Sequence, residues 1–243
     1  MQTKLGIYAT NKINEDFGTN LSIGKVNLSF LGSIALKEVQ IRDHHKDTLI
    51  FVKKISTSLL SVKKVFNNKL LFDAITIEDA FYFMKTYKGE TTNNMSVFTA
   101  SFRSDTPKDS LDLPFILKAN NVYIQNLDLR ISNDNKEKPL NFSATNIGGN
   151  VQDLDIVGAV VALNTRGLYF RTNQDLQVTS FTTNYKFTKS AMTFESTRLE
   201  TENSRLNANI FFTYGRGGLS NFNDKVQIEA EFKESNLKVL DLK

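Results

Sequence analysis

The chain has 243 residues, of which 40% are hydrophobic, and its 30 lysine and arginine residues against 26 acidic residues give a formal net charge of +4. This small positive excess is spread along the sequence and is not gathered into blocks, so the charge pattern does not predict a nucleic-acid partner. The chain contains no cysteine, which excludes disulfides, thiolate metal sites and cysteine nucleophiles.

Residues 2–17 place apolar side chains three and four positions apart, which predicts one short amphipathic helix. The N-terminus has no basic region followed by an apolar run, and no stretch of eighteen apolar residues occurs anywhere in the chain. We therefore expect no targeting signal and no membrane-spanning segment within this sequence.

From Leu21 onward the apolar residues recur with a period of two, which is typical of strands with one buried face. The alternation slips by one residue at Gly24–Lys25 and again at Lys37–Glu38, which predicts either a bulge or a change of face at each point. Similar blocks recur at residues 75–84 and 122–131. This weak internal repeat favours a sheet that grows by the addition of similar strands.

The clearest alternation lies near the C-terminal end, where two apolar rows are predicted to form a hairpin. Charged and polar residues separate the apolar positions of the second row, so we expect its apolar side to avoid water. We predict that the two rows are adjacent strips of a lipid-binding surface: Leu206, Ala208, Ile210 and Phe212 in the first, and Val226, Ile228, Ala230 and Phe232 in the second.

Two further short helices are predicted in the connections. Asn93 or Asn94 can cap a helix over 94–103, and Ser61 can cap one over 61–66. A polar loop near residue 103 is the best candidate boundary. It divides the chain into residues 1–103, with the N-terminal helix, first strand block and short helices, and residues 104–243, which continue the same sheet. The alternative is one single domain.

Residues with catalytic chemistry are scarce. His44 and His45 are the only histidines, and because adjacent residues on a strand point to opposite faces, we expect an inert pair in a surface turn and no metal site. No Gly-x-Ser-x-Gly motif is present. Paired carboxylates such as Glu229 and Glu231 are expected on a solvated strand face. The sequence therefore predicts no catalytic residues, no cofactor and no enzyme activity.

Short strand-and-turn motifs along the chain carry a resemblance to a known family. The runs at 17–23, 26–30, 41–50, 199–201, 204–206, 224–226 and 240–242 are similar to the N-terminal periplasmic region of TamB-like translocation and assembly module proteins from Bacteroidota, within the AsmA-like superfamily. The resemblance implies a periplasmic body attached to the inner membrane by an N-terminal anchor, which this chain does not contain. It also implies an elongated, coiled sheet with a taco-like groove whose apolar side holds lipid.

We therefore predict a mostly β protein with an elongated, twisted and coiled antiparallel sheet and short helices. Its expected function is a non-catalytic segment of an envelope module for lipid transport or outer-membrane protein assembly, with a phospholipid or another acyl-chain lipid as ligand. The alternative is a structural β domain that docks an outer-membrane barrel protein at a sheet edge. A third possibility is a carboxylate-dependent glycan hydrolase. A period of two fits an open groove and a closed core equally.

Overall fold

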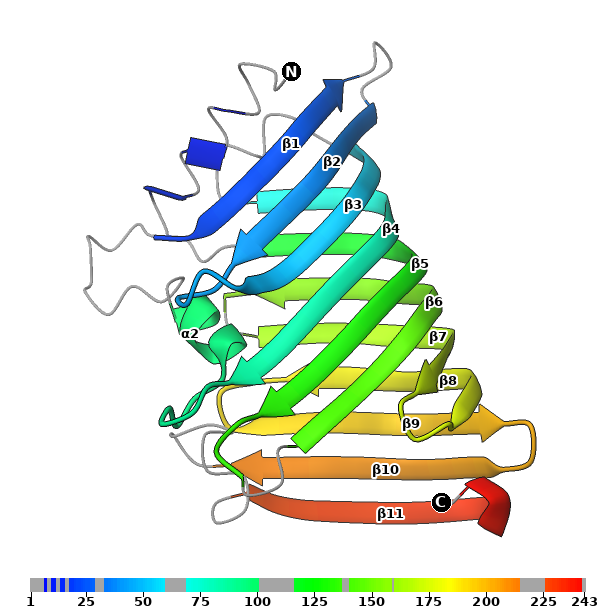
Figure 1. Cartoon of the computed structure of the whole chain (residues 1–243). Coiled ribbons are helices and arrows are strands. Elements are labelled where there is room, and N and C mark those ends of the chain that lie inside the picture. Colours follow the sequence, from blue (N-terminus) through cyan, green and yellow to red (C-terminus); the bar gives the residue numbers. More distant parts are fainter. Residues whose placement is uncertain are drawn as a thin grey trace.

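The computed structural model describes residues 18–28, 33–59, 69–100, 116–136, 140–158, 160–214 and 226–241, together with Ile7, Thr10, Asn11, Asn14 and Glu15. Within these residues, eleven strands form one open sheet in which the strands follow one another in chain order (Figure 1). The predicted mostly β fold with a large, antiparallel-dominated sheet is confirmed.

The strands vary in length from 9 to 18 residues. Their bounds are β1 Asn20–Leu28, β2 Ser33–Arg42, β3 Thr48–Leu59, β4 Lys69–Thr86, β5 Ile116–Asn133, β6 Leu140–Val157, β7 Val160–Thr172, β8 Gln177–Phe187, β9 Ala191–Thr201, β10 Arg205–Tyr214 and β11 Val226–Asn236. The helix α2 spans Asn94–Ala100 and the 3-10 helix η3 spans Val239–Asp241.

One pair of neighbouring strands breaks the antiparallel pattern. Strands β4 and β5 run parallel, with Lys69 opposite Ile116 and Thr86 opposite Asn133. A parallel pair cannot be joined by a tight turn, so the chain must cross from one end of the sheet to the other. This crossover contains α2. Strands from both sides of the proposed boundary at residue 103 thus lie in the same sheet.

The cap of α2 agrees with the sequence prediction. The Asn93 side chain accepts a 2.8 Å hydrogen bond from the Ser96 backbone N–H, which satisfies a donor at the helix start. The described helix ends at Ala100. The predicted continuation to residue 103 and the predicted helix over 61–66 lie outside the described residues. The five described residues between Ile7 and Glu15 are helical, as the sequence predicts.

The slip in alternation at Lys37–Glu38 occurs at a residue with a left-handed backbone conformation, and the pairing register of β1 with β2 does not shift there. Glu38 has a positive φ of 54°, and Gly24 lies opposite it, since Ile23 pairs with Val39 and Lys25 with Lys37. Ile23 and Val26 both belong to the same buried cluster although they lie three residues apart. The two residues between them, Gly24 and Lys25, therefore leave the apolar residues of β1 on one face of the sheet.

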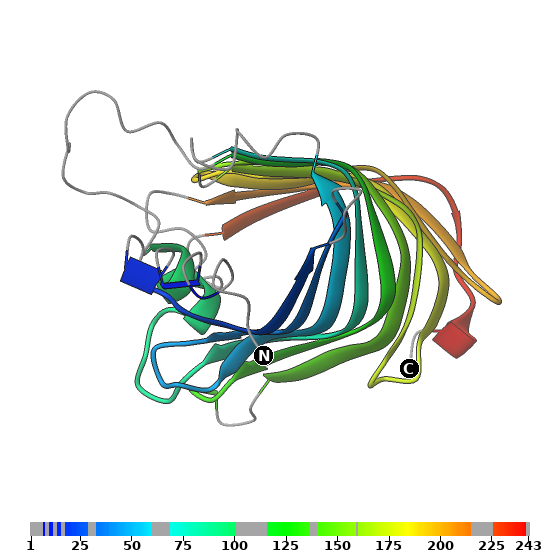
Figure 2. The same cartoon turned by 90° about the horizontal axis from the view of Figure 1, so that it is seen from above.

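Similar positive-φ residues recur across the sheet, with φ values of 50° at Asp79 and 65° at Asn126. Asp79 and Asn126 lie opposite each other on β4 and β5, and the Asn126 side chain donates a 2.8 Å hydrogen bond to Asp79. Bulges increase the local bend and twist of a strand. Figure 2 shows the result: the long strands curve so strongly that the sheet forms a trough, with α2 at its open side.

Candidate functional site

One face of the sheet is apolar over most of its length. Two buried clusters, one on β1–β3 and one on β5–β7, are joined because Ile77 of β4 packs against both. We call this surface the apolar face, and define it by Ile23, Val26, Val39, Val52, Ile77, Ala80, Ala119, Val122, Val151, Leu168, Leu206, Ala208, Ile210 and Phe212.

The opposite face of the sheet carries side-chain ion pairs between neighbouring strands. Lys53 of β3 forms a 2.8 Å ion pair with Asp79 of β4, and Lys118 of β5 forms a 2.8 Å ion pair with Asp155 of β6. The Lys53 side chain is 67% exposed and that of Lys118 is 50% exposed, so water reaches both pairs. Exposed ion pairs of this kind add little stability, but they keep this face soluble.

The curvature of the sheet assigns the apolar face to the inside of the trough. All described strands belong to one sheet, so no second described sheet covers these side chains. Side chains converge on the concave side of a bent sheet and splay apart on the convex side. The buried residues therefore lie on the concave side, and the exposed ion pairs lie on the convex side.

Two tyrosines on distant strands support this assignment. Burial raises the pKa of Tyr82 on β4 well above its usual value, and nearby Tyr185 on β8 raises it further. Burial also raises the pKa of Tyr185, to about 12. Strands β5, β6 and β7 lie between β4 and β8 in the sheet. Tyr185 acts on the pKa of Tyr82 across these three strands, as expected if the bend brings β4 and β8 to face the same space.

The first predicted row, on β10, continues the apolar face. Leu206, Ala208 and Phe212 lie opposite Leu199, Thr197 and Met192 of β9. Ala208 is only 3% exposed, and the Phe212 ring centroid lies 6.0 Å from that of Phe194. The aromatic residues of β8 and β9 were not singled out from the sequence, although their own alternation contained the signal.

The second predicted row, on β11, lies beside the first. Phe232, Ala230, Ile228 and Val226 are opposite Ala208, Ile210, Phe212 and Tyr214, respectively. Ile228 is 52% exposed and Phe232 is 65% exposed, because β11 is the last described strand of the sheet. The structure thus places the two rows as adjacent strips, one largely buried and one open to solvent.

A second group of interest lies at the end of the trough, in the turn between β2 and β3. The Lys46 N–H donates to the Asp43 carbonyl at 2.9 Å, and Lys46 has a φ of 69°. This confirms the surface turn predicted for His44 and His45. The argument that the two neighbours point apart was wrong, however, because it holds for a strand and not for a tight turn.

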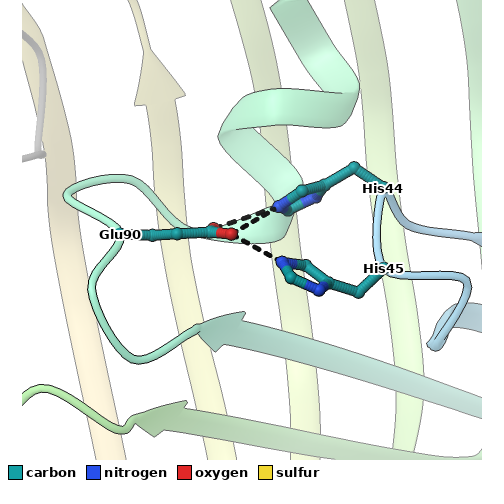
Figure 3. A group of neighbouring side chains, drawn as sticks. All are labelled: His44, His45 and Glu90. Carbon is teal, nitrogen blue, oxygen red and sulfur yellow. Dashed lines mark hydrogen bonds and ion pairs between the residues drawn. The ribbon is translucent and has the colours of Figure 1, made fainter.

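Both imidazoles point toward Glu90, in the loop after β4 (Figure 3). Nε2 of His44 lies 3.0 Å from Glu90 Oε2, and Nε2 of His45 lies 2.6 Å from Glu90 Oε1. A hydrogen bond from His45 lowers the pKa of Glu90 below its usual value, burial opposes this effect, and His44 lowers the pKa further. Sequence reasoning missed Glu90 because it lies 45 residues from His45.

A buried carboxylate organises this turn. Asp43 is 2% exposed and accepts hydrogen bonds from the Asn94 side chain at 2.9 Å, the Tyr87 hydroxyl at 2.7 Å and the backbone N–H of His45 at 2.9 Å. Burial raises the pKa of Asp43, but its hydrogen bonds outweigh burial and the pKa lies below its usual value. Asp43 thus joins the turn, the loop after β4 and the start of α2.

The loop that carries Glu90 is held from the other side by Asn135. The Asn135 side chain donates to the Glu90 carbonyl at 2.7 Å and accepts from the Gly89 N–H at 2.7 Å. Gly89 has a φ of 86°, which glycine adopts without strain. The backbone around Glu90 is therefore fixed independently of its carboxylate.

No protein-family model and no curated protein sequence matches this chain. Among the described residues, no helix is both long and apolar enough to cross a membrane.

Proposed function

We propose that the chain is a non-catalytic, periplasmic segment of a TamB-like envelope module, and that its apolar face binds the acyl chains of a phospholipid or similar lipid. The observation that carries the proposal is the continuous apolar face on the concave side of an open sheet. Eleven strands at a spacing of about 4.8 Å make this face roughly 50 Å long.

Hydrophobic transfer is sufficient to hold such a ligand. Each buried methylene contributes about 0.8 kcal/mol, so about ten methylenes contribute roughly 8 kcal/mol before the cost of ordering the chain is subtracted. No nucleophile, general base or cofactor is required. The half-buried aliphatic and aromatic side chains of the apolar face supply the contacts.

The test compares two adjacent positions on β11 that face opposite sides of the sheet. Ile228→Asp places a carboxylate on the apolar face where the side chain is already 52% exposed, so the fold should survive. Gln227→Asp places the same charge on the polar face and is the matched control. Lipid co-purifying with each protein is extracted with organic solvent and measured by mass spectrometry. We expect less lipid on Ile228→Asp than on Gln227→Asp, and a wild-type protein that never carries lipid would refute the proposal.

The free edge of the sheet supports a second candidate, docking of an outer-membrane barrel protein by strand addition. At the other end of the sheet, the Asn14 side chain accepts from the Leu21 N–H and donates to the Leu21 carbonyl, both at 2.8 Å, and so occupies the edge of β1. No described residue pairs in this way with the outer edge of β11. Lipid-free protein that binds a barrel partner, and loses it when proline is introduced on β11, would favour this function.

A further inference from the structure

We propose that His44, His45 and Glu90 bind one divalent transition-metal ion of the Zn²⁺ class. Their ligand atoms, two imidazole nitrogens and a carboxylate oxygen, all lie within 4.8 Å of one another. Two histidines and one carboxylate form a ligand set that suits zinc and leaves a fourth position for water. This inference does not depend on lipid binding.

The distances from the Glu90 carboxylate to the two imidazoles are close to those that zinc requires. Tetrahedral Zn²⁺ with bonds of about 2.0–2.1 Å places neighbouring ligand atoms roughly 3.3 Å apart. The carboxylate lies 3.0 Å from His44 Nε2 and 2.6 Å from His45 Nε2. The three ligand atoms lie within 4.8 Å of one another, so adjustments of about 1–2 Å at the side chains bring them to the spacing that the ion needs. The side chains are exposed enough to make these adjustments, at 29% for His44, 44% for His45 and 28% for Glu90.

Residues that are not metal ligands hold the two loops that carry the ligands. Asp43 fixes the histidine turn, and Asn135 fixes the backbone of Gly89 and Glu90. Tyr87 packs against the His45 ring at a centroid distance of 3.9 Å. Its hydroxyl donates to Asp43 at 2.7 Å, so the ring is itself held in place. Such supporting contacts orient the first ligands and raise metal affinity.

The chemistry of the three groups selects among metal ions. Imidazole nitrogen suits Zn²⁺, Ni²⁺ and Cu²⁺, whereas Mg²⁺ prefers oxygen ligands and retains several waters. A single carboxylate beside two histidines is therefore a poor Mg²⁺ site. When the ion binds, each Nε2 must be unprotonated, so the remaining ring proton lies on Nδ1.

The ion would connect the turn between β2 and β3 to the loop that leads into α2. Asn94 at the start of α2 also donates to Asp43, so the site adjoins the helix at the open side of the trough (Figures 2 and 3). Bound metal would therefore hold the beginning of α2 against the strand ends.

The first test is isothermal titration calorimetry of the full chain with ZnCl₂, with MgCl₂ as the control ion. We expect one Zn²⁺ per chain and no Mg²⁺ binding. His44→Ala, His45→Ala and Glu90→Gln should each weaken Zn²⁺ binding by at least about tenfold, whereas Glu202→Gln, an exposed carboxylate in the turn after β9, should leave it unchanged. Absence of saturable Zn²⁺ binding, or equal affinity in the double variant His44→Ala/His45→Ala, would overturn the proposal.

A second measurement on the unaltered protein keeps the test independent of variant folding. The chain has only two histidines, so long-range ¹H–¹⁵N spectra contain two sets of imidazole signals. Zinc should convert both rings to the form with a proton on Nδ1 and metal on Nε2. A response from only one ring, or from neither, would contradict a shared site.

Discussion

The Tyr87 hydroxyl donates a 2.7 Å hydrogen bond to the carboxylate of Asp43, 44 residues away in the sequence. The same hydroxyl oxygen lies 2.8 Å from a carboxylate oxygen of Asp47, so its one proton is shared between two acidic neighbours. Because Asp43 is 2% exposed, water cannot readily replace a lost donor. This hydrogen bond joins the turn between β2 and β3 to the loop after β4, and we expect the stability of the protein to depend on it.

Removal of the Tyr87 hydroxyl should destabilise the protein. Tyr87→Phe removes the single O–H proton that the buried Asp43 carboxylate accepts, and we expect the free energy of unfolding to fall by about 1–3 kcal/mol. Tyr169, which is 52% exposed, provides the control. Tyr169→Phe should change the free energy of unfolding by less than about 0.5 kcal/mol. Urea unfolding followed by circular dichroism measures both. Equal stability of the two variants would mean that the Tyr87–Asp43 bond contributes nothing.

Stability should also decrease in acid through Asp43. Although burial opposes the shift, the folded-state pKa of Asp43 lies below its usual value because of its hydrogen bonds, so folding favours the ionised form. The stabilisation is therefore fully present above the unfolded pKa and is lost as the pH falls through the lower, folded pKa. Urea unfolding at a series of pH values below about 5 should show a steeper loss for the wild type than for Asp43→Asn. Parallel curves would exclude Asp43 as a source of the acid sensitivity.

The concave position of Ala208 predicts a strong effect of charge. Ala208 is 3% exposed between Thr197 of β9 and Phe232 of β11. Ala208→Asp would bury a carboxylate without a partner, and we expect the free energy of unfolding to fall by about 3–5 kcal/mol. Thr213→Asp, on the exposed side of the same strand, should lower the free energy of unfolding far less. Thermal melting compares the two, and a fully stable Ala208→Asp would show that water reaches this part of the apolar face.

The close approach of Gly24 to Glu38 can be tested by a double-mutant cycle. A Cβ atom added at Gly24 would lie 2.9 Å from the Cβ of Glu38, so Gly24→Ala should cost about 1–3 kcal/mol. Glu38→Gly removes that neighbour and suits the φ of 54°, so it should be neutral or stabilising. The cost of Gly24→Ala should then be smaller in the Glu38→Gly background. Additive effects would show that the two positions do not constrain each other.

Local features of this protein were readable from the sequence because they depend on near neighbours. The period of two identified the strands β10 and β11 and their position side by side, since residues on one side of a strand share one environment. The slip at Lys37–Glu38 marked a local irregularity, the positive φ of Glu38, for the same reason. Asn93 was identifiable as a helix cap because its partner, Ser96, is three residues away.

Other features were decided only by the tertiary structure. The sequence between β4 and β5 did not reveal that these strands run parallel, because strand direction depends on the path of the whole crossover. Alternation could not distinguish a bent single sheet from a closed core, since both bury one face. The contact of Glu90 with His44 and His45 requires a tight turn that points both imidazole rings in the same direction. It also requires a loop that lies 45 residues further along the chain. The periodicity of apolar residues predicts neither of them.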